Sequence, residues 1–414
     1  MLWIVNLPPT MSFLFVSGID TRAPRLAGGE RTDQLDRSGH YARWEDDFAL
    51  AHRLGLDAIF YGPAYYRAHV SPGHYDWDTC SEPMERLRLL GMMPIADLAH
   101  AGVPSWMTGV GDPKFPEHFA DYARAFAKRF PWVTHFAPVR SLGDVAAASA
   151  LDGRWNEARS SDADFLRTVA NMARAHELAV SAILAERPDA TIVLSAPAAH
   201  AHAAGEGARA EAERRNARRW LGLDLCLGVE LGEATHKALS DAGVKDAELR
   251  FFREKRAARV GARVLSVAWA PDTERRLSSG GRETSVVQRL GLRHLGTRLH
   301  ERYALPLLCA ETHAPSRHAR AWLKQQWEDV LSLRAAGVDV AGFGWAPLTD
   351  APRLGAGPRV MEDIGLAEGT RELKPVGEFF RDLVARWRPV LAVPGVALPA
   401  RGVRRRARGQ SSLR

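Results

Sequence analysis

The 414-residue sequence predicts an α/β fold, a closed (β/α)8 or TIM barrel. Short apolar runs alternate with longer segments in which apolar residues recur about every 3.6 positions. Such alternation is typical of a parallel sheet that is buried on both faces. Eight runs occur, which is the number that closes a barrel, and such barrels span about 200 to more than 400 residues with insertions.

We expect the eight strands, in chain order, at Phe13–Ser17, Ala58–Tyr61, Met93–Leu98, Thr134–Val139, Thr191–Ser195, Ala262–Ala268, Leu305–Ala310 and Val338–Trp345. We expect helices between them at Trp44–Leu54, Glu117–Phe130, Asp162–Glu186, Val286–Tyr303 and Arg317–Ala335. The last of these helices ends before Gly337, as a helix C-terminus should.

An open doubly wound sheet is the alternative fold, but it favours a glycine-rich turn after the first strand. The sequence there reads Gly18-Ile19-Asp20-Thr21-Arg22, which lacks that pattern. The connection from Pro197 to Gly261 is too long for one crossover and contains a charged helix at Glu206–Trp220. We expect it to lie on the face formed by the C-terminal ends of the strands.

We expect the chain to divide into an extension over residues 1–12, a (β/α)8 barrel over 13–389 and a basic, disordered tail over 390–414. Hydrophobic residues make up 46% and charged residues 25% of the chain, as in an ordinary globular protein. Without a long apolar run or a secretory signal, we expect a cytoplasmic protein with no membrane partner. The net charge of +7 lies partly in the tail, which we interpret as a solvated end, so no nucleic-acid partner is expected.

Cysteines and histidines give no pattern for a metal or a disulfide framework. Cys80, Cys226 and Cys309 lie far apart in the sequence and are expected to be inert core thiols. The histidines at 200, 202 and 313 lack the spacing of metal ligands, so no metal is predicted.

Polar and aromatic residues follow the expected strands, where a barrel of this type places its functional groups. Strand three ends in Asp97-Leu98-Ala99-His100, strand seven in Glu311-Thr312-His313, and strand eight in Trp345. Aromatic rings pack on the apolar faces of a sugar, whereas carboxylates and imidazoles bind its hydroxyls. This mixture therefore predicts a carbohydrate partner.

Four segments together resemble glycoside hydrolase family 1, the β-glucosidase family, over about Phe13 to Pro389. They are Asp97-Leu98-Ala99-His100-Ala101-Gly102-Val103-Pro104-Ser105-Trp106, Phe115-Pro116-Glu117-His118-Phe119-Ala120-Asp121-Tyr122-Ala123, Ala310-Glu311-Thr312-His313, and Gly342-Phe343-Gly344-Trp345-Ala346-Pro347-Leu348-Thr349-Asp350. The resemblance implies a (β/α)8 barrel that hydrolyses β-glycosides with retention and without a metal or organic cofactor.

The resemblance also implies roles for individual residues. Glu311 matches the nucleophile, His100 a ligand of the sugar hydroxyls and Trp345 a wall of the sugar subsite. Asp20 stands where the family usually has a hydrogen-bonding glutamine or glutamate. Trp269 follows the sixth strand, near the position of a tyrosine that orients the nucleophile, and is a further candidate for substrate binding.

The chain departs from the family after the fourth strand. In place of Asn-Glu-Pro it has Arg140-Ser141-Leu142, so that Ser141 replaces the acid/base glutamate and Arg140 an asparagine that binds substrate. A serine has no proton to donate at neutral pH, and general acid catalysis contributes about 10² to 10⁴ in rate. Asp144 is the nearest carboxylate in sequence and a weak candidate for a substitute acid.

Two hypotheses remain open. In the first, the chain hydrolyses or transfers a β-linked glycosyl group through a covalent intermediate on Glu311, with substrates whose leaving group needs little protonation. In the second, the barrel is catalytically inactive and binds a glycan or a partner enzyme. A second carboxylate facing Glu311 would favour the first hypothesis, and a Glu311 paired only to Arg140 would favour the second.

Overall fold

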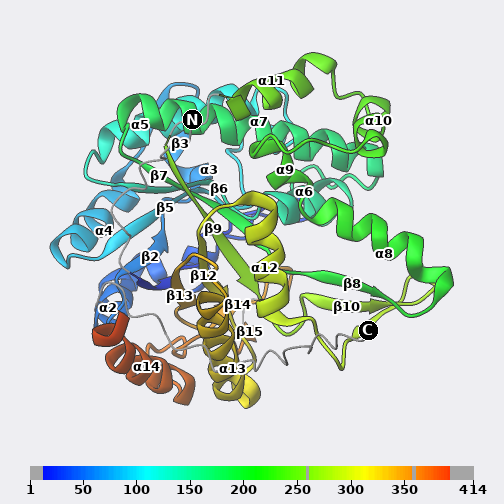
Figure 1. Cartoon of the computed structure of the whole chain (residues 1–414). Helices are drawn as coiled ribbons and strands as arrows, with labels where there is room; N and C mark the ends of the chain where they lie inside the picture. The colour runs from blue at the N-terminus through cyan, green and yellow to red at the C-terminus, as the bar shows by residue number, and fades with distance from the viewer. Residues whose placement is uncertain (1–12, 258–260, 357–359, 392–414) are drawn as a thin grey trace, which may run out of the picture.

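The computed structural model describes residues 13–257, 261–356 and 360–391, and these residues form a closed barrel of eight parallel strands (Figure 1). The predicted extension over 1–12 and nearly all of the predicted tail lie outside the described residues. The barrel strands are β1 (Leu14–Gly18), β2 (Ala58–Tyr61), β5 (Met93–Ala99), β6 (His135–Val139), β7 (Thr191–Pro197), β9 (Ala262–Trp269), β12 (Leu307–Thr312) and β13 (Val340–Trp345). They neighbour one another in this order, and β13 pairs with β1 to close the ring. The predicted fold class is confirmed.

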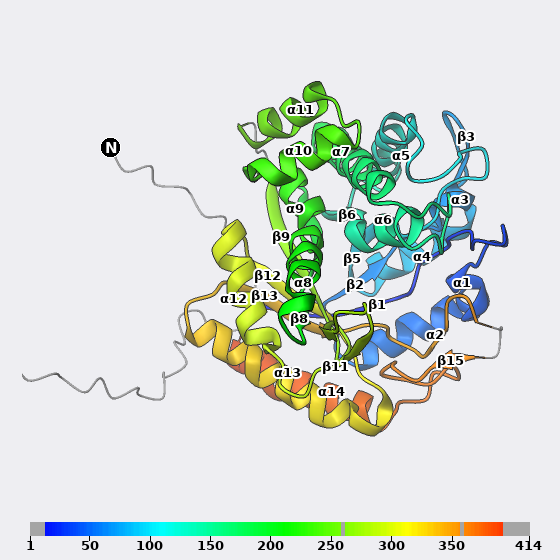
Figure 2. The ribbon, with the colours of Figure 1, turned by 90° about the vertical axis from the view of Figure 1, so that its right-hand side faces the viewer.

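Helices surround the barrel and cover the outer face of its strands (Figure 2). The principal ones are α2 (His40–Arg53), α4 (Asp78–Leu89), α5 (Phe115–Arg129), α7 (Asp162–Glu186), α12 (Gly291–Tyr303), α13 (Ser316–Ala335) and α14 (Pro375–Leu391). In α5 the buried residues Phe119, Tyr122 and Phe126 recur at helical spacing, which places one apolar face against the barrel. None of the helices in the described part of the chain is both long and apolar enough to cross a membrane.

Side chains that alternate along the strands fill the barrel interior. A separate buried cluster contains Val16, Ala58, Phe60, Ile95, Ala137, Val193, Val264, Leu308 and Ala310. Successive strand residues point to opposite faces, so the residues two positions after Ile95 and Val264 point inward as well. This parity aims Asp97 and Ser266 into the barrel, next to the site described below.

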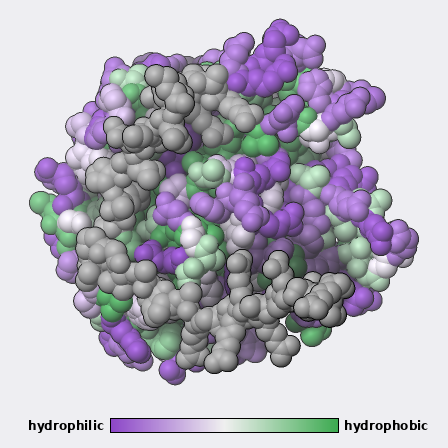
Figure 3. Space-filling view, in the orientation of Figure 1, coloured by the Kyte–Doolittle hydropathy of each residue, from purple (hydrophilic) through white to green (hydrophobic). Residues whose placement is uncertain are grey.

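The long connection after β7 contains a strand, β8 (His200–Ala203), and four helices: α8 (Glu206–Arg219), α9 (Leu221–Cys226), α10 (Glu233–Asp241) and α11 (Asp246–Ala257). The charged helix is thus confirmed. The sequence analysis did not predict that β8 pairs in parallel with β10 (Glu274–Leu277), which in turn pairs with β11 (Glu283–Ser285). This small sheet joins the connections that follow two different barrel strands. Hydrophilic residues predominate on the face that includes α8, α10 and α11 (Figure 3).

Shorter elements complete the fold: α1 (Gln34–Arg37), α3 (Tyr65–Ala68), α6 (Leu142–Ala150), and the hairpins β3 (His69–Ser71) with β4 (His74–Tyr75) and β14 (Ala351–Pro352) with β15 (Met361–Glu362). Two predicted helix starts are wrong, and one of them is that of α2, which begins at His40 and not at Trp44. Helix α12 begins at Gly291 and not at Val286, because the buried carboxylate of Glu274 accepts hydrogen bonds from the backbone N–H groups of Leu290 and Gly291. The side chain of Glu274, at the start of the short strand β10, therefore determines where this helix begins.

Candidate active site

Glu311 lies near the end of β12, and its side chain is 11% exposed. Its Oε2 atom accepts a hydrogen bond from Arg140 Nη2 at 2.9 Å, and its Oε1 atom accepts one from Ser266 Oγ at 2.6 Å. Ser266 belongs to β9, the strand that pairs with β12. Both oxygens of the carboxylate are therefore held in place.

Arg140 follows directly after β6, and its side chain is 5% exposed. Its second terminal nitrogen, Nη1, donates to Asp97 Oδ2 at 3.0 Å, and its guanidinium lies 4.5 Å from the centre of the Phe60 ring. Burial alone would lower the pKa of Arg140, but the negative charges of Glu311 and Asp97 outweigh this effect and raise it. The guanidinium is thus a permanent cation between two carboxylates.

Asp97 anchors this network from β5. Its Oδ2 atom accepts a hydrogen bond from Thr21 Oγ1 at 2.7 Å and lies 3.5 Å from His100 Nδ1. Burial would raise the pKa of Asp97, but His100, Arg140 and the Thr21 hydroxyl together hold it below the usual value. No separate role was predicted for Asp97, which is part of the motif at the end of the third expected strand. Its strand parity with Ile95 nevertheless indicates that it points inward.

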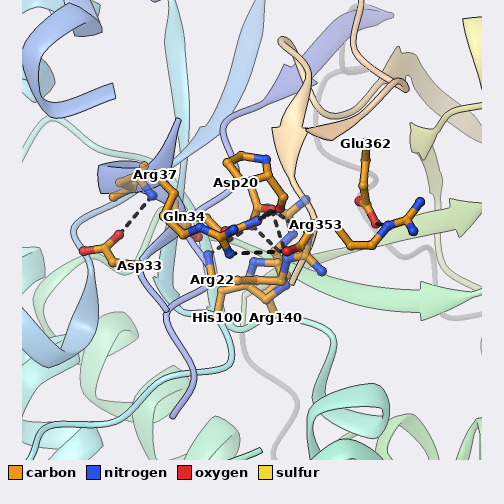
Figure 4. Close-up of polar contacts among 12 residues, drawn as sticks. Asp20, Arg22, Asp33, Gln34, Arg37, His100, Arg140, Arg353 and Glu362 are labelled. Carbon is orange, nitrogen blue, oxygen red and sulfur yellow. Dashed lines mark hydrogen bonds and ion pairs between the residues drawn. The ribbon is translucent and has the colours of Figure 1, made fainter. Parts of the chain in front are cut away.

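Asp20 lies beside this network and is already bound by a neighbouring cation (Figure 4). Arg22 donates to both of its oxygens, with Nε at 2.8 Å from Oδ1 and Nη2 at 2.6 Å from Oδ2. The amide of Gln34 adds a weaker contact at 3.3 Å. Although burial opposes the charge, Arg22 keeps the pKa of Asp20 well below its usual range.

A cavity of about 270 Å³ brings several predicted site residues together at the C-terminal ends of the strands. Its lining includes Asp20, His100, Arg140, Ser141 and Glu311, all of which were candidates from the sequence. The cavity wall also contains three chemically active residues that the sequence analysis did not single out as site residues: Arg22, His313 and Glu362.

Two of these added residues have altered proton affinities. Burial lowers the pKa of His313, so its imidazole is neutral at physiological pH. Burial raises the pKa of Glu362, and Arg22 only partly offsets this increase. Glu362 belongs to the β14–β15 hairpin, and its Oε1 atom lies 3.7 Å from Arg353 Nε. No periodic signal in the sequence would have placed this hairpin over the barrel.

The structure does not bring the two tryptophan candidates to the cavity. Trp345 is fully buried, and its indole N–H donates to the Ile364 carbonyl at 2.8 Å. Trp269 is also buried and stacks on Trp322 with ring centres 5.6 Å apart. Both rings belong to the larger buried cluster outside the barrel interior, because outward-facing residues at strand ends meet the surrounding helices and loops.

Ser141 and Asp144 lie at the start of α6. Ser141 has a left-handed backbone with φ of 51° and lines the cavity, where it presents a hydroxyl group and no carboxyl group. Asp144 belongs to the first turn of α6 and lines a larger neighbouring cavity instead. The surrounding protein displaces bulk water and Glu311 adds negative charge, so the pKa of Asp144 is raised although its side chain is exposed.

Comparison with known proteins identifies the fold. No family model and no curated protein matches the sequence. Among solved structures, the chain is similar to the β-glucosidase of Thermotoga maritima in complex with castanospermine, with a TM-score of 0.75 and 15% identity over 92% of this chain and 99% of that one. The same enzyme in complex with deoxynojirimycin gives a TM-score of 0.73 and 17% identity over 84% and 87% of the two chains.

A further structure, described as a family 1 β-glucosidase from Thermotoga maritima, gives a TM-score of 0.73 and 16% identity over 84% of this chain. At these identities the likeness shows the fold. The chain has a β-glucosidase-like (β/α)8 barrel with a polar, charged cavity at the C-terminal ends of its strands, the face on which enzymes with this fold carry their active sites.

Proposed function

We propose that this protein acts on β-glycosides and that Glu311 is its nucleophile. One observation carries the proposal: the carboxyl group of Glu311 at the end of β12 lines the cavity and is fixed by Arg140 and Ser266. A nucleophilic carboxylate has to be charged and oriented before it attacks the anomeric carbon. The β-glucosidase-like fold supports a carbohydrate as the ligand.

The proposed first step forms a bond between a Glu311 oxygen and the anomeric carbon, while the bond from that carbon to the leaving group breaks. In a retaining glycosidase a second carboxyl group about 5–5.5 Å away protonates the leaving group. Ser141 offers no such proton, and the carboxyl groups of Asp20, Asp97 and Glu362 are each paired with an arginine. We therefore expect substrates whose leaving group departs as an anion.

The test is a burst assay with a 2-deoxy-2-fluoro β-glycoside that carries a dinitrophenyl leaving group, followed by intact-mass measurement. Dinitrophenolate departs without protonation, so the missing acid does not obstruct the reaction. We expect one sugar adduct per chain in the natural protein and none in the Glu311→Gln variant. Glu328→Gln is a matched control that should still form the adduct, because Glu328 is an exposed glutamate of α13 outside this cavity. Absence of an adduct with gluco, galacto and uronic acid donors would refute the proposal.

The second candidate is a barrel that binds a glycan or a partner enzyme without catalysis. The observation in its favour is that Arg140 and Ser266 already occupy both oxygens of Glu311. This candidate predicts that sugars bind to the natural protein and to Glu311→Gln alike, without an adduct in either.

A further inference from the structure

A second cavity of about 640 Å³ lies beside the proposed sugar site, between α6, α8 and the small β8–β10–β11 sheet. Its wall includes Gly143 and Asp144, which follow closely after Ser141 of the sugar cavity. Residues of both walls therefore stand within three positions of one another at the start of α6.

Arg219, at the end of α8, lines this second cavity. Its Nη1 atom donates to Asn216 Oδ1 at 3.2 Å and lies 3.5 Å from His200 Nδ1. Within the described residues, no carboxylate lies at ion-pair distance from Arg219, and its buried Nε atom has no hydrogen-bond partner. Its guanidinium lies 4.3 Å from the Trp220 ring centre, and its second terminal nitrogen, Nη2, makes no hydrogen bond to the described residues.

Arg298 adds positive charge near Arg219, and the buried carboxylate of Glu274 partly offsets it. Arg298 lies 5.7 Å from the same Trp220 ring, and burial together with Arg298 lowers the pKa of Arg219 to about 10. Arg219 therefore stays charged at neutral pH. Burial lowers the pKa of His200 to about 4, so this histidine is neutral and its other tautomer can donate to an anion.

The acidic residues of the same wall are mostly neutralised by other arginines. Glu211 pairs with Arg214 and Arg215, and Glu283 pairs with Arg215. Asp162 pairs with Arg218 at 2.5 Å, and Asp152 with Arg154 at 2.8 Å. Asp144 is the remaining acidic side chain of the wall, at the junction with the sugar cavity.

We propose that this cavity is a subsite for a phosphate-class anionic group carried by the glycoside, with Arg219 as its ligand. The inference rests on the proposed function, because it identifies the leaving group that Glu311 displaces. Guanidinium groups bind phosphate through paired, charge-assisted hydrogen bonds. A glycosyl phosphate fits two unusual features of the chain. The usual proton donor is absent, and the guanidinium of Arg219 has no ion pair among the described residues.

The reaction balances without a general acid. Glu311 bonds to the anomeric carbon of a glycosyl phosphate monoanion, and the bond from that carbon to the bridging oxygen breaks. The electron pair stays on the oxygen, and the group departs as the phosphate dianion. Water then attacks the anomeric carbon, which releases the Glu311 carboxylate, the free sugar and one proton to solvent.

The test measures binding of inorganic phosphate, pyrophosphate and a nucleoside diphosphate to the full chain by calorimetry. We expect binding to the natural protein and a loss of about 10- to 100-fold in Arg219→Gln, the range for one charge-assisted hydrogen bond. Arg209→Gln is the matched control, because Arg209 lies on the same helix, pairs with exposed Glu206 and is outside the cavity. Arg219→Lys, which keeps the charge, should retain most of the affinity.

A second measurement tests whether the two cavities act on the same substrate. Phosphate should speed the turnover of the fluoroglycosyl adduct on Glu311, as seen by intact mass, and Arg219→Gln should abolish this effect. Tighter binding of the nucleoside diphosphate than of pyrophosphate would assign a nucleotide-linked sugar, and the reverse order a simple glycosyl phosphate. Absence of anion binding to the natural protein, or equal losses in both glutamine variants, would overturn the inference. An adduct that forms but does not respond to phosphate would overturn only the link between the cavities, whereas Arg219-dependent binding without any adduct would refute the proposed function and keep the anion site.

Discussion

Replacement of Arg140 by methionine should expose how strongly the barrel interior depends on one cation. The substitution keeps much of the side-chain volume and leaves Asp97 and Glu311 without their shared guanidinium. Removal of one partner from a buried ion pair typically costs about 3–5 kcal/mol, because an uncompensated charge stays in the interior. We expect a loss of this size at pH 7.

The corresponding change in melting temperature follows from the chain length. With an unfolding entropy of about 2.1 cal/mol/K per residue, a chain of 414 residues should lose roughly 3–6 °C. Thermal unfolding followed by circular dichroism measures this shift. The control is Arg154→Met, which breaks the exposed pair with Asp152 and should change stability by less than about 1 kcal/mol.

The loss of stability in Arg140→Met should depend on pH. In the natural protein the pKa of Asp97 is lowered, so its contribution to stability is present above the unfolded pKa and is lost as the pH falls through the folded value. Without Arg140, we expect burial to raise the pKa of Asp97. Acidification towards pH 5 then protonates Asp97 in the folded variant, and the difference in free energy of unfolding between the variant and the natural protein becomes smaller. A loss below about 1 kcal/mol that does not change with pH would contradict the buried, charged network.

Three further predictions concern other parts of the same structure. Ser266→Ala removes a hydrogen bond to Glu311 and should slow adduct formation about tenfold, the equivalent of roughly 1.4 kcal/mol, in single-turnover measurements. Glu274→Ala removes two backbone contacts at the start of α12 and should cost about 1–3 kcal/mol in urea unfolding, with faster amide exchange there. Burial would raise the pKa of Asp47, but hydrogen bonds from His40 and Arg371 lower it. Asp47 should therefore stabilise the fold above about pH 4 and lose this effect as the pH falls, and Asp47→Asn should reduce the acid dependence of the melting temperature.

Each of these predictions has a result that would contradict it. An unchanged rate in Ser266→Ala would mean that Arg140 alone orients the nucleophile. Unaltered exchange in Glu274→Ala would show that α12 does not need its cap. Equal acid sensitivity with and without the Asp47 carboxylate would assign the acid transition to other groups.

The sequence was sufficient to predict the barrel, because hydrophobic periodicity records which faces of strands and helices are buried. It also placed Glu311, Arg140 and His100 at strand ends, and the structure brings them to one cavity. It could not predict the burial of Trp345, because that depends on a contact with Ile364 from a later loop. Long-range contacts of this kind leave no local pattern in the sequence.

The missed residues differ in how predictable they were. Ser266 and Asp97 share strand parity with interior residues, so alternation alone indicates that they face the barrel axis. Glu362 lies on β15 and Arg219 at the end of α8, and the positions of these two elements depend on packing between segments distant in sequence. Their positions follow only once the tertiary structure is known.

The parallel pairing of β8 with β10 has a mechanical consequence for the larger cavity. The two strands follow different barrel strands, β7 and β9, so the ladder between them ties both connections to the rim. A lid that opened by a hinge motion would have to break the hydrogen bonds between β8 and β10. This pairing therefore holds the wall of the cavity in one position. Ligands then enter through a standing opening, and selection among them depends on the shape and charge of a preformed surface.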